Sequence, residues 1–444
     1  MALSSMSQQV LSRATKAKIT VAAGFGGLIE YFDLVIAAYT AASIWPIVFF
    51  PGNVADALGI SIGAVAVTFL ARPVGAFIFG HVGDKLGRRN TLVYTLILLG
   101  GSTLGIGLVP GYTSIGYSAI ALLFFFRITF GLGMGGEFGG AVSWIVEVAS
   151  DSKKRSFWAV WAAPATFGLV LAGVVFTAMS AALGHNMQTY GWRIPFIVGS
   201  LMTVVGLVIR YRLTDSPMFR AIKEKGQLAR APAIAALRRF WKPILMMGLM
   251  DAVQITLATG VQAPFSIGYL AIHHISPTFT SFSITFSNAI GMITWIIGPF
   301  MSEKFGRKRT LLVCNGIFVV AMAAFFPLIN TLNLTLIVLA QTLISATIGL
   351  SNAGIQTLMA ESFPTKYRYS GAGISYQIAA LIAGIVTTIV ASATSAVGTL
   401  SATPYIAAIV MIVIVAAIVA NIMIKDTKGV DLHQLDAVET PVAQ

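Results

Sequence analysis

The chain has 444 residues, of which 57% are hydrophobic and 10% are charged. Soluble domains carry roughly 25% charged residues, so this composition leaves too few polar side chains to cover a water-soluble globule and excludes a soluble enzyme. The formal net charge is +13, but the basic residues lie between apolar segments rather than along one face, which argues against a nucleic-acid partner. The single cysteine, Cys314, excludes an internal disulfide and a cysteine metal cluster.

Apolar stretches long enough to cross a membrane recur along the whole chain, where a spanning helix needs about 20 such residues. Six of them precede a polar, basic stretch in the middle of the chain and six follow it. We therefore predict an all-α membrane protein with twelve transmembrane helices in two six-helix bundles. The predicted spans are residues 19–45, 58–82, 91–111, 116–149, 156–182, 192–211, 243–270, 279–302, 309–330, 333–360, 369–395 and 402–424.

This pattern divides the chain into five parts, and the positions of Lys and Arg give their orientation. Basic residues concentrate in alternate connections, as they do in cytoplasmic loops, so we place both termini in the cytoplasm and the protein in the cell membrane. The predicted parts are a cytoplasmic N-terminal segment (1–18), a first bundle (19–211), a cytoplasmic central loop (212–242), a second bundle (243–424) and a cytoplasmic tail (425–444).

The two predicted bundles share a repeated segment. DKLGRRNTL at 84–92 and EKFGRKRTL at 303–311 are 219 residues apart and are identical at five of nine positions. Internal duplication is typical of secondary transporters, which bind their substrate between the repeats near the middle of the membrane. The repeat therefore predicts that a pseudo-two-fold axis relates the bundles.

Several motifs resemble one superfamily of transporters. GHVGDKLGRR at 80–89 fits the loop motif of the major facilitator superfamily at every fixed position, and RITFG at 127–131 fits its fourth-helix pattern. Further motifs are EYFD at 30–33, RP at 72–73, FGH at 79–81, GGEFGG at 135–140, DSPMF at 215–219 and ESFPTKYRYSGA at 361–372. Together they resemble a narrower family, the metabolite:proton symporters. The familiar first-helix form of that family has Trp-Tyr where this chain has Tyr31 and Phe32.

The resemblance implies a function. Members of the narrower family carry carboxylates and zwitterions such as betaine and proline together with protons. It therefore implies a proton-coupled symporter for a small carboxylated or zwitterionic metabolite, working by alternating access. Its partners would be the solute, protons and membrane lipid, with no cofactor or metal and with the monomer as the working unit. The alternatives are a proton-driven exporter, a sugar-type carrier on the same fold and a non-transporting solute sensor. A membrane enzyme is disfavoured because the sequence shows no nucleophile motif, metal cluster or cofactor loop.

Ionisable side chains inside the predicted spans are candidates for proton coupling. Each costs roughly 2.5–3.5 kcal/mol to insert and persists where it faces a cavity or a partner. Asp33 and Arg127 lie at compatible depths, so we expect protonation of Asp33 to free Arg127 for a substrate carboxylate; a purely structural ion pair is the alternative. Arg72 fits a structural role better than a ligand-binding one. The other candidate proton sites are Glu30, Glu137 and Asp251, of which Glu30 and Glu137 have the alternative of locking helices together by hydrogen bonds.

Polar and aromatic side chains of the spans would complete a binding pocket. Packing between helices is the alternative role for such residues, because their facing cannot be read from sequence. The predicted substrate ligands besides Arg127 are Tyr31, Gln254, Tyr376 and Gln377.

The repeated loop motif predicts a gate. In the superfamily that the chain resembles, these contacts hold the cytoplasmic side shut, with Asp84 capping the N-terminus of span eleven. Arg88 would reach an acid at the inner end of span four, either Glu147 or Asp151, and the second copy of the motif should tolerate substitution better than the first. The predicted gating residues are Gly80, Asp84, Gly87, Arg88, Arg89, Glu147, Glu303 and Arg307.

Overall fold

The computed structural model describes residues 12–50, 54–149, 154–160, 165–397 and 399–438. Within these ranges the regular structure is helical throughout. The helices of the first half are α1 (Arg13–Ser43), α2 (Trp45–Phe49), α3 (Val54–Leu86), α4 (Arg88–Leu108), α5 (Tyr112–Ile115), α6 (Tyr117–Val148), α7 (Arg155–Ala159), α8 (Ala165–Leu183) and α9 (Arg193–Tyr211), with a π-helical turn η3 (Met187–Gly191). Those of the second half are α10 (Pro217–Glu224), α11 (Pro232–Thr256), α12 (Ser266–Ile272), α13 (Pro277–Phe305), α14 (Arg307–Asn330), α15 (Leu334–Glu361), α16 (Thr365–Val397), α17 (Thr399–Met423) and α18 (Leu432–Val438), with a π-helical segment η4 (Leu257–Phe265).

Among the described residues, eleven helical segments are long and apolar enough to cross a membrane, and α8 adds a shorter apolar helix at Phe167–Leu183. Each long segment coincides with one predicted span. The helix α8 occupies most of the remaining predicted span, 156–182, of which residues 161–164 lie outside the described part of the chain. The chain therefore folds as an all-helical protein of the kind that passes through a membrane many times.

The central stretch 212–242, which the sequence predicts as a loop, contains α10 and the first turns of α11. The Ser216 hydroxyl accepts a hydrogen bond from the Phe219 backbone N–H at 3.1 Å, and Pro217 takes the first helical position; both features favour a helix start. The backbone of α11 leaves helical geometry at Phe240, because Pro243 has no N–H to donate and its ring crowds the preceding turn.

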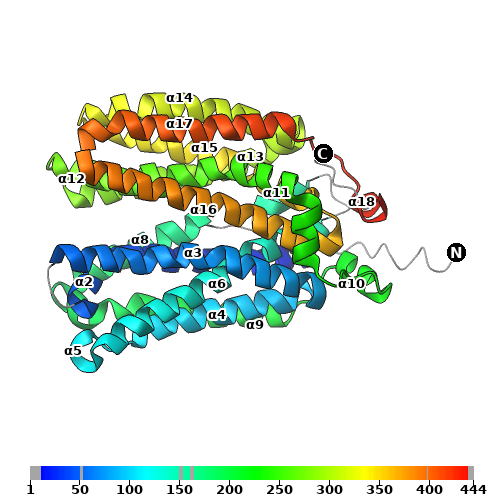
Figure 1. The fold of residues 1–444 in the computed structure, drawn as a ribbon, viewed down its shortest axis with the longest axis horizontal. Helices are drawn as coiled ribbons and strands as arrows, with labels where there is room; N and C mark the ends of the chain where they lie inside the picture. Colours follow the sequence, from blue (N-terminus) through cyan, green and yellow to red (C-terminus); the bar gives the residue numbers. More distant parts are fainter. Residues whose placement is uncertain (1–11, 51–53, 150–153, 161–164, 398, 439–444) are drawn as a thin grey trace.

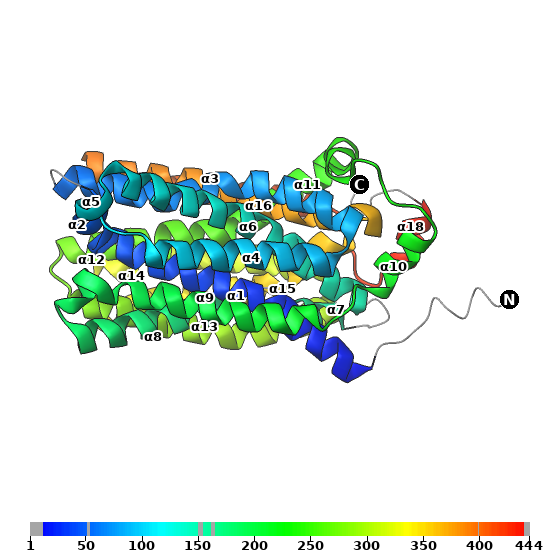
Figure 2. The same ribbon diagram turned by 90° about the horizontal axis from the view of Figure 1, so that it is seen from below.

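The long helices run side by side in two groups (Figure 1), α1 to α9 in one and α11 to α17 in the other. Figure 2 shows α3 beside α16 and α8 beside α13, which are two of the places where the groups touch. Both described chain ends, α10 and α18 lie at one end of the molecule, together with the α3–α4 and α13–α14 connections. We call this the basic end, because its connections are rich in Lys and Arg. The helices α2, α5 and α12 lie at the opposite end.

The two copies of the repeated motif make the same turn at the basic end. Gly87 and Gly306 have φ of +110° and +100°, a backbone region that favours glycine. A Cβ at Gly87 would lie 2.4 Å from Asp215 Oδ2, and a Cβ at Gly306 would lie 2.2 Å from Asp426 Oδ2. Glycine is therefore required in both turns by conformation and by space.

Glycines spaced four apart on α6 allow close approach of its neighbours. A Cβ on Gly131 would lie 2.4 Å from the Thr68 carbonyl oxygen of α3, and one on Gly139 would lie 2.7 Å from the Tyr369 carbonyl oxygen of α16. Small residues at this spacing are typical of tightly packed membrane helices. This close packing explains the glycine-rich run on α6.

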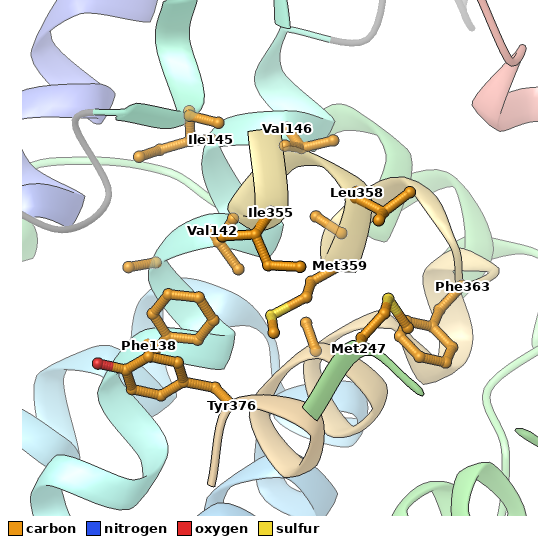
Figure 3. Packing of buried hydrophobic residues seen from close by; sticks show 14 of the residues in the cluster. Phe138, Val142, Ile145, Val146, Met247, Ile355, Leu358, Met359, Phe363 and Tyr376 are labelled. Atoms are coloured by element: carbon orange, nitrogen blue, oxygen red, sulfur yellow. The ribbon is translucent and has the colours of Figure 1, made fainter. Parts of the chain in front are cut away.

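A hydrophobic cluster fills the space between the two groups in the half of the molecule nearer the basic end (Figure 3). It includes Phe138 and Val142 from α6, Met247 from α11, Met359 from α15 and Tyr376 from α16. The rings of Phe138 and Tyr376 are stacked with centroids 3.8 Å apart. The two groups are therefore packed together on this side of the molecule.

Candidate functional site

A cavity of about 480 Å³ lies between the two groups of helices. Phe138 and Tyr376 line it and also belong to the hydrophobic cluster, so they form its floor. On the other side its lining extends to Ile275 and Thr280, at the α12–α13 connection. The cavity thus reaches toward the opposite end and is closed toward the basic end. Its polar lining includes Tyr31, Asp251, Gln254, Gln262, Asn288, Asn352, Gln356 and Tyr376.

Tyr31 and Tyr376 connect the two groups at the floor of the cavity. Their hydroxyl oxygens are 2.7 Å apart, so one phenol from α1 and one from α16 share a hydrogen bond. The Arg72 guanidinium lies 5.3 Å from the centre of the Tyr376 ring. Both tyrosines, which the sequence analysis named as candidate substrate ligands, line the cavity.

Asp251 and Gln254 also line the cavity, on α11. Asp251 Oδ1 accepts a hydrogen bond from the Gln254 side-chain amide, and the Gln254 Oε1 atom accepts one from the Ser351 hydroxyl at 3.1 Å. Asp251 Oδ2 is buried without a hydrogen-bond partner. Asp251, predicted as a proton site, therefore lies in the cavity wall.

Arg127 and Gln377, two predicted substrate ligands, are not among the described residues that line the cavity. Gln377 Oε1 accepts a hydrogen bond from Arg72 Nε at 2.8 Å. Arg72 in turn lies 3.9 Å from Glu30, measured from Nη2 to Oε1, and neither of these two atoms has a hydrogen-bond partner. The Glu30–Arg72 contact is therefore long for an ion pair, and neither residue is among the described residues that line the cavity.

Asp33 and Arg127 meet inside the first group. Arg127 Nη1 donates to Asp33 Oδ1 at 2.7 Å, and both side chains are fully buried. The Thr103 hydroxyl donates to Asp33 Oδ2 at 2.8 Å, and Arg127 Nε donates to the Thr68 hydroxyl at 3.1 Å. This ion pair therefore joins α1, α3, α4 and α6.

Glu137 forms a separate buried ion pair with Arg210 of α9. The Thr95 hydroxyl donates to Glu137 Oε2 at 2.7 Å. The Arg210 guanidinium also donates to the carbonyl oxygens of Ala22, at 2.9 Å, and Leu92, at 2.7 Å. Arg210 is fully buried, and its contacts join α1, α4, α6 and α9.

The first copy of the loop motif crosses from one group to the other at the basic end. Asp84 accepts hydrogen bonds from the backbone N–H groups of Tyr369 and Ser370, at 3.2 and 3.0 Å, and from the Ser370 hydroxyl at 2.6 Å. It also pairs with Arg88 at 2.8 Å, and Arg88 reaches Glu147 at 3.0 Å. Asp84 therefore lies against the first turns of α16, and Arg88 contacts Glu147; Asp151 lies outside the described residues.

Other gating candidates shape this contact. A Cβ on Gly80 would lie 2.9 Å from Ser370 Cα, so α3 and α16 touch there. Arg89 donates its backbone N–H to Asp215 Oδ1 at 2.8 Å, and burial raises the pKa of the Asp215 carboxyl. Arg368 of α16 also pairs with Glu147, at 3.1 Å, so Glu147 binds arginines from both groups.

The second copy builds a parallel network. Arg307 pairs with Glu303 at 3.0 Å and with Glu361 at 3.1 Å. Glu361 also pairs with Arg155 of the first group at 3.2 Å, and Glu303 accepts a hydrogen bond from the Ser156 backbone N–H at 2.6 Å. The Glu303 side chain is 19% exposed, whereas the Asp84 side chain is fully buried. The acidic residue of the second motif copy is therefore more accessible to solvent than that of the first.

The sequence analysis did not assign Glu361, Arg368 or Arg155 to the gate. The internal repeat could have identified them. Glu361 follows Glu147 by 214 residues and Arg368 follows Arg155 by 213, close to the 219 residues that separate the two loop motifs. Within the described part of the chain, no three His, Cys, Asp or Glu side chains gather where they could hold a metal ion.

Two helical groups that enclose a cavity closed at one end define a secondary transporter of the two-bundle type. The profile of the Major Facilitator Superfamily matches residues 25–374 and 253–442, so the chain belongs to that superfamily. It is a multi-pass transporter of the plasma membrane and not an enzyme.

Relatives of the chain are named as transporters of metabolites. The chain is similar to the inner membrane metabolite transport protein YhjE of Escherichia coli (strain K12), at 31% identity over 400 residues, covering 84% of this chain and 87% of the relative. It is also similar to a provisionally named proline/betaine transporter of Staphylococcus haemolyticus (strain JCSC1435), at 31% identity, covering 85% of this chain and 81% of the relative.

The structure is similar to the proton:xylose symporter XylE of E. coli bound to 6-bromo-6-deoxy-D-glucose. The TM-score is 0.73 at 17% sequence identity, and the match covers 96% of this chain and 100% of the other. At this identity the similarity shows the shared fold.

Proposed function

We propose that the protein is a proton-coupled symporter for a small carboxylated or zwitterionic metabolite, working by alternating access. In this proposal twelve spans cross the membrane, six in a bundle at 19–211 and six in a bundle at 243–424, and the monomer, surrounded by lipid, is the working unit. The N-terminal segment 1–18, the stretch 212–242 and the tail 425–444 lie in the cytoplasm.

The orientation rests on the positions of the basic residues. The basic end carries the Lys- and Arg-rich connections, and such connections face the cytoplasm. The cavity would then load from outside, with its floor at the tyrosine pair and its inner side closed by the two ion-pair networks. In this proposal the conformation described here is the outward-facing one.

The observation that carries proton coupling is the fully buried contact of Asp33 with Arg127 at 2.7 Å. Protonation of Asp33 would leave Arg127 without its counter-charge, and an uncompensated buried cation is costly. Arg127 has a free Nη2 atom but lies away from the cavity wall, so we assign it to coupling rather than to direct substrate contact. Asp33 is two residues from Tyr31 on α1, so a change in the Asp33–Arg127 ion pair is transmitted through α1 to the floor of the cavity.

Reconstituted transport tests the proposal. The purified protein is placed in liposomes, and uptake of radiolabelled proline, glycine betaine, α-ketoglutarate, citrate and xylose is measured with acid outside, with and without a protonophore. We expect at least one of the first four compounds to accumulate, and the protonophore to abolish accumulation. Failure to accumulate any of them refutes the proposal, and accumulation of xylose alone assigns a sugar-type carrier instead.

A further inference from the structure

Asp251 is the one residue with a formal charge among the described residues that line the cavity. It is 2% exposed, and its Oδ2 atom has no hydrogen-bond partner. Its other oxygen is held by Gln254, so the carboxylate is fixed in place with one oxygen unused. A buried carboxylate oxygen without a partner is costly, and the structure offers the adjoining cavity as the place from which a partner can come.

The surroundings of Asp251 fit a cation that carries apolar substituents. Tyr31, Phe138, Trp295 and Tyr376 line the same cavity. Ring faces attract cations, and ammonium groups with apolar substituents are the ligands most often recognised in this way. An acid beside several aromatic rings is therefore a site for an ammonium group rather than for an anion or a neutral sugar.

The remaining polar lining fits the other end of a zwitterion. Gln262, Asn288, Asn352 and Gln356 bring side-chain amides to the cavity, and amide N–H groups donate to carboxylates.

We infer that Asp251 is the residue that determines substrate specificity, by pairing with a cationic nitrogen of the substrate, and that the substrate is a small zwitterion. This replaces the proton-coupling role that the sequence suggested for Asp251. The inference rests on the proposed function in that the ligand of this cavity is the transported solute. It narrows the carboxylated or zwitterionic metabolite to a molecule that carries both charges.

Matched pairs of ligands test the inference without a gradient. Glycine betaine is compared with 3,3-dimethylbutanoate, and proline with cyclopentanecarboxylate; each second compound keeps the shape and the carboxylate but lacks the positive nitrogen. Binding to the purified full chain is measured by calorimetry. We expect the wild type to bind at least one zwitterion about tenfold or more tightly than its partner, the ratio that 1.4 kcal/mol represents. Equal binding within both pairs, or no binding of either zwitterion, overturns the inference.

Variants then assign the preference to Asp251. Asp251→Asn should reduce the preference to about one, Asp251→Glu should retain part of it, and Asp215→Asn, a charge change at the basic end, should leave it intact. A preference that survives in Asp251→Asn overturns the assignment. The wild-type comparison stands even where a variant does not fold.

The outcome is separable from proton coupling. A wild type that prefers the zwitterion but does not accumulate it under a pH gradient contradicts the symport proposal and leaves the role of Asp251 intact. An Asp251→Asn variant that keeps the preference but loses gradient-driven accumulation makes Asp251 a proton site and overturns the inference.

Discussion

Asp84→Asn should open the basic end. Asp84 accepts four hydrogen bonds, one from Arg88 and three from Tyr369 and Ser370 across the boundary between the groups. The amide nitrogen of asparagine cannot accept a hydrogen bond, so the hydrogen bonds to one of the two carboxylate oxygens are lost together with the negative charge. Hydrogen bonds to charged groups contribute about 1.5–3 kcal/mol each, and a charge at a helix N-terminus contributes up to about 2 kcal/mol.

We take the net loss as about 3 kcal/mol, because water satisfies the freed groups in the open state. Since 1.4 kcal/mol is a factor of ten, the open population should rise by up to about a hundredfold. Transport should slow, because the outward-facing state becomes scarce, while solute binding survives.

A single cysteine reports the opening. The Ser156 hydroxyl lies 2.9 Å from the Ser302 hydroxyl between the two groups and is fully buried. In a Cys314→Ala background, the rate at which a membrane-impermeant maleimide labels Ser156→Cys from the basic end should rise with Asp84→Asn. Asp215→Asn is the matched control, since the hydrogen bond that Asp215 accepts from the Arg89 backbone N–H does not cross to α16. An unchanged rate in Asp84→Asn, or an equal rise in the control, refutes the reasoning.

Three further predictions concern the Glu137–Arg210 ion pair, the packing of α6 against α16 and the contact of α18 with α16. Glu137→Gln leaves Arg210 without its counter-charge and should cost about 3–5 kcal/mol of stability; an unchanged thermal unfolding temperature in detergent contradicts this. Gly139→Val places atoms within 2.7 Å of the Tyr369 carbonyl oxygen. It should raise the rate of labelling at Ser156→Cys, as Asp84→Asn does. A lower rate would mean that the two groups of helices separate at a place other than the contact between α6 and α16. Asp436→Ala removes the acceptor of the Thr365 N–H at 2.6 Å, a cap at the start of α16 that is worth about 1 kcal/mol, so labelling should rise about fivefold; no rise would mean that α18 does not hold the basic end closed.

The fold could be predicted from the sequence largely because a membrane imposes a length on every crossing helix. The prediction placed a loop at 212–242, where α10 and the start of α11 lie. That stretch is amphipathic rather than uniformly apolar, so a search for apolar stretches misses it. The cap at Ser216 and the buried side chains of Met218 and Phe219 were the signals of a surface helix.

The charged contacts were predictable where the motif supplies both partners. Asp84, Arg88 and Glu147 lie together because the loop motif and the end of span four meet at one level. The partner of Glu137 was not predictable, since Arg210 resembles the ordinary basic residue at a cytoplasmic helix end. Which polar residues face the cavity depends on helix rotation, and so Gln254 lines it whereas Gln377 is turned toward Arg72.

Proton movement that accompanies the solute tests the central claim most directly. Liposomes that contain the protein and an internal pH dye, with no imposed gradient, receive the compound that accumulates best from the uptake panel. We predict that its addition acidifies the interior in the wild type, and that Asp33→Asn abolishes acidification while one-for-one exchange of labelled solute continues. Solute entry in the wild type with no change of internal pH, or acidification that persists in Asp33→Asn, would contradict the account.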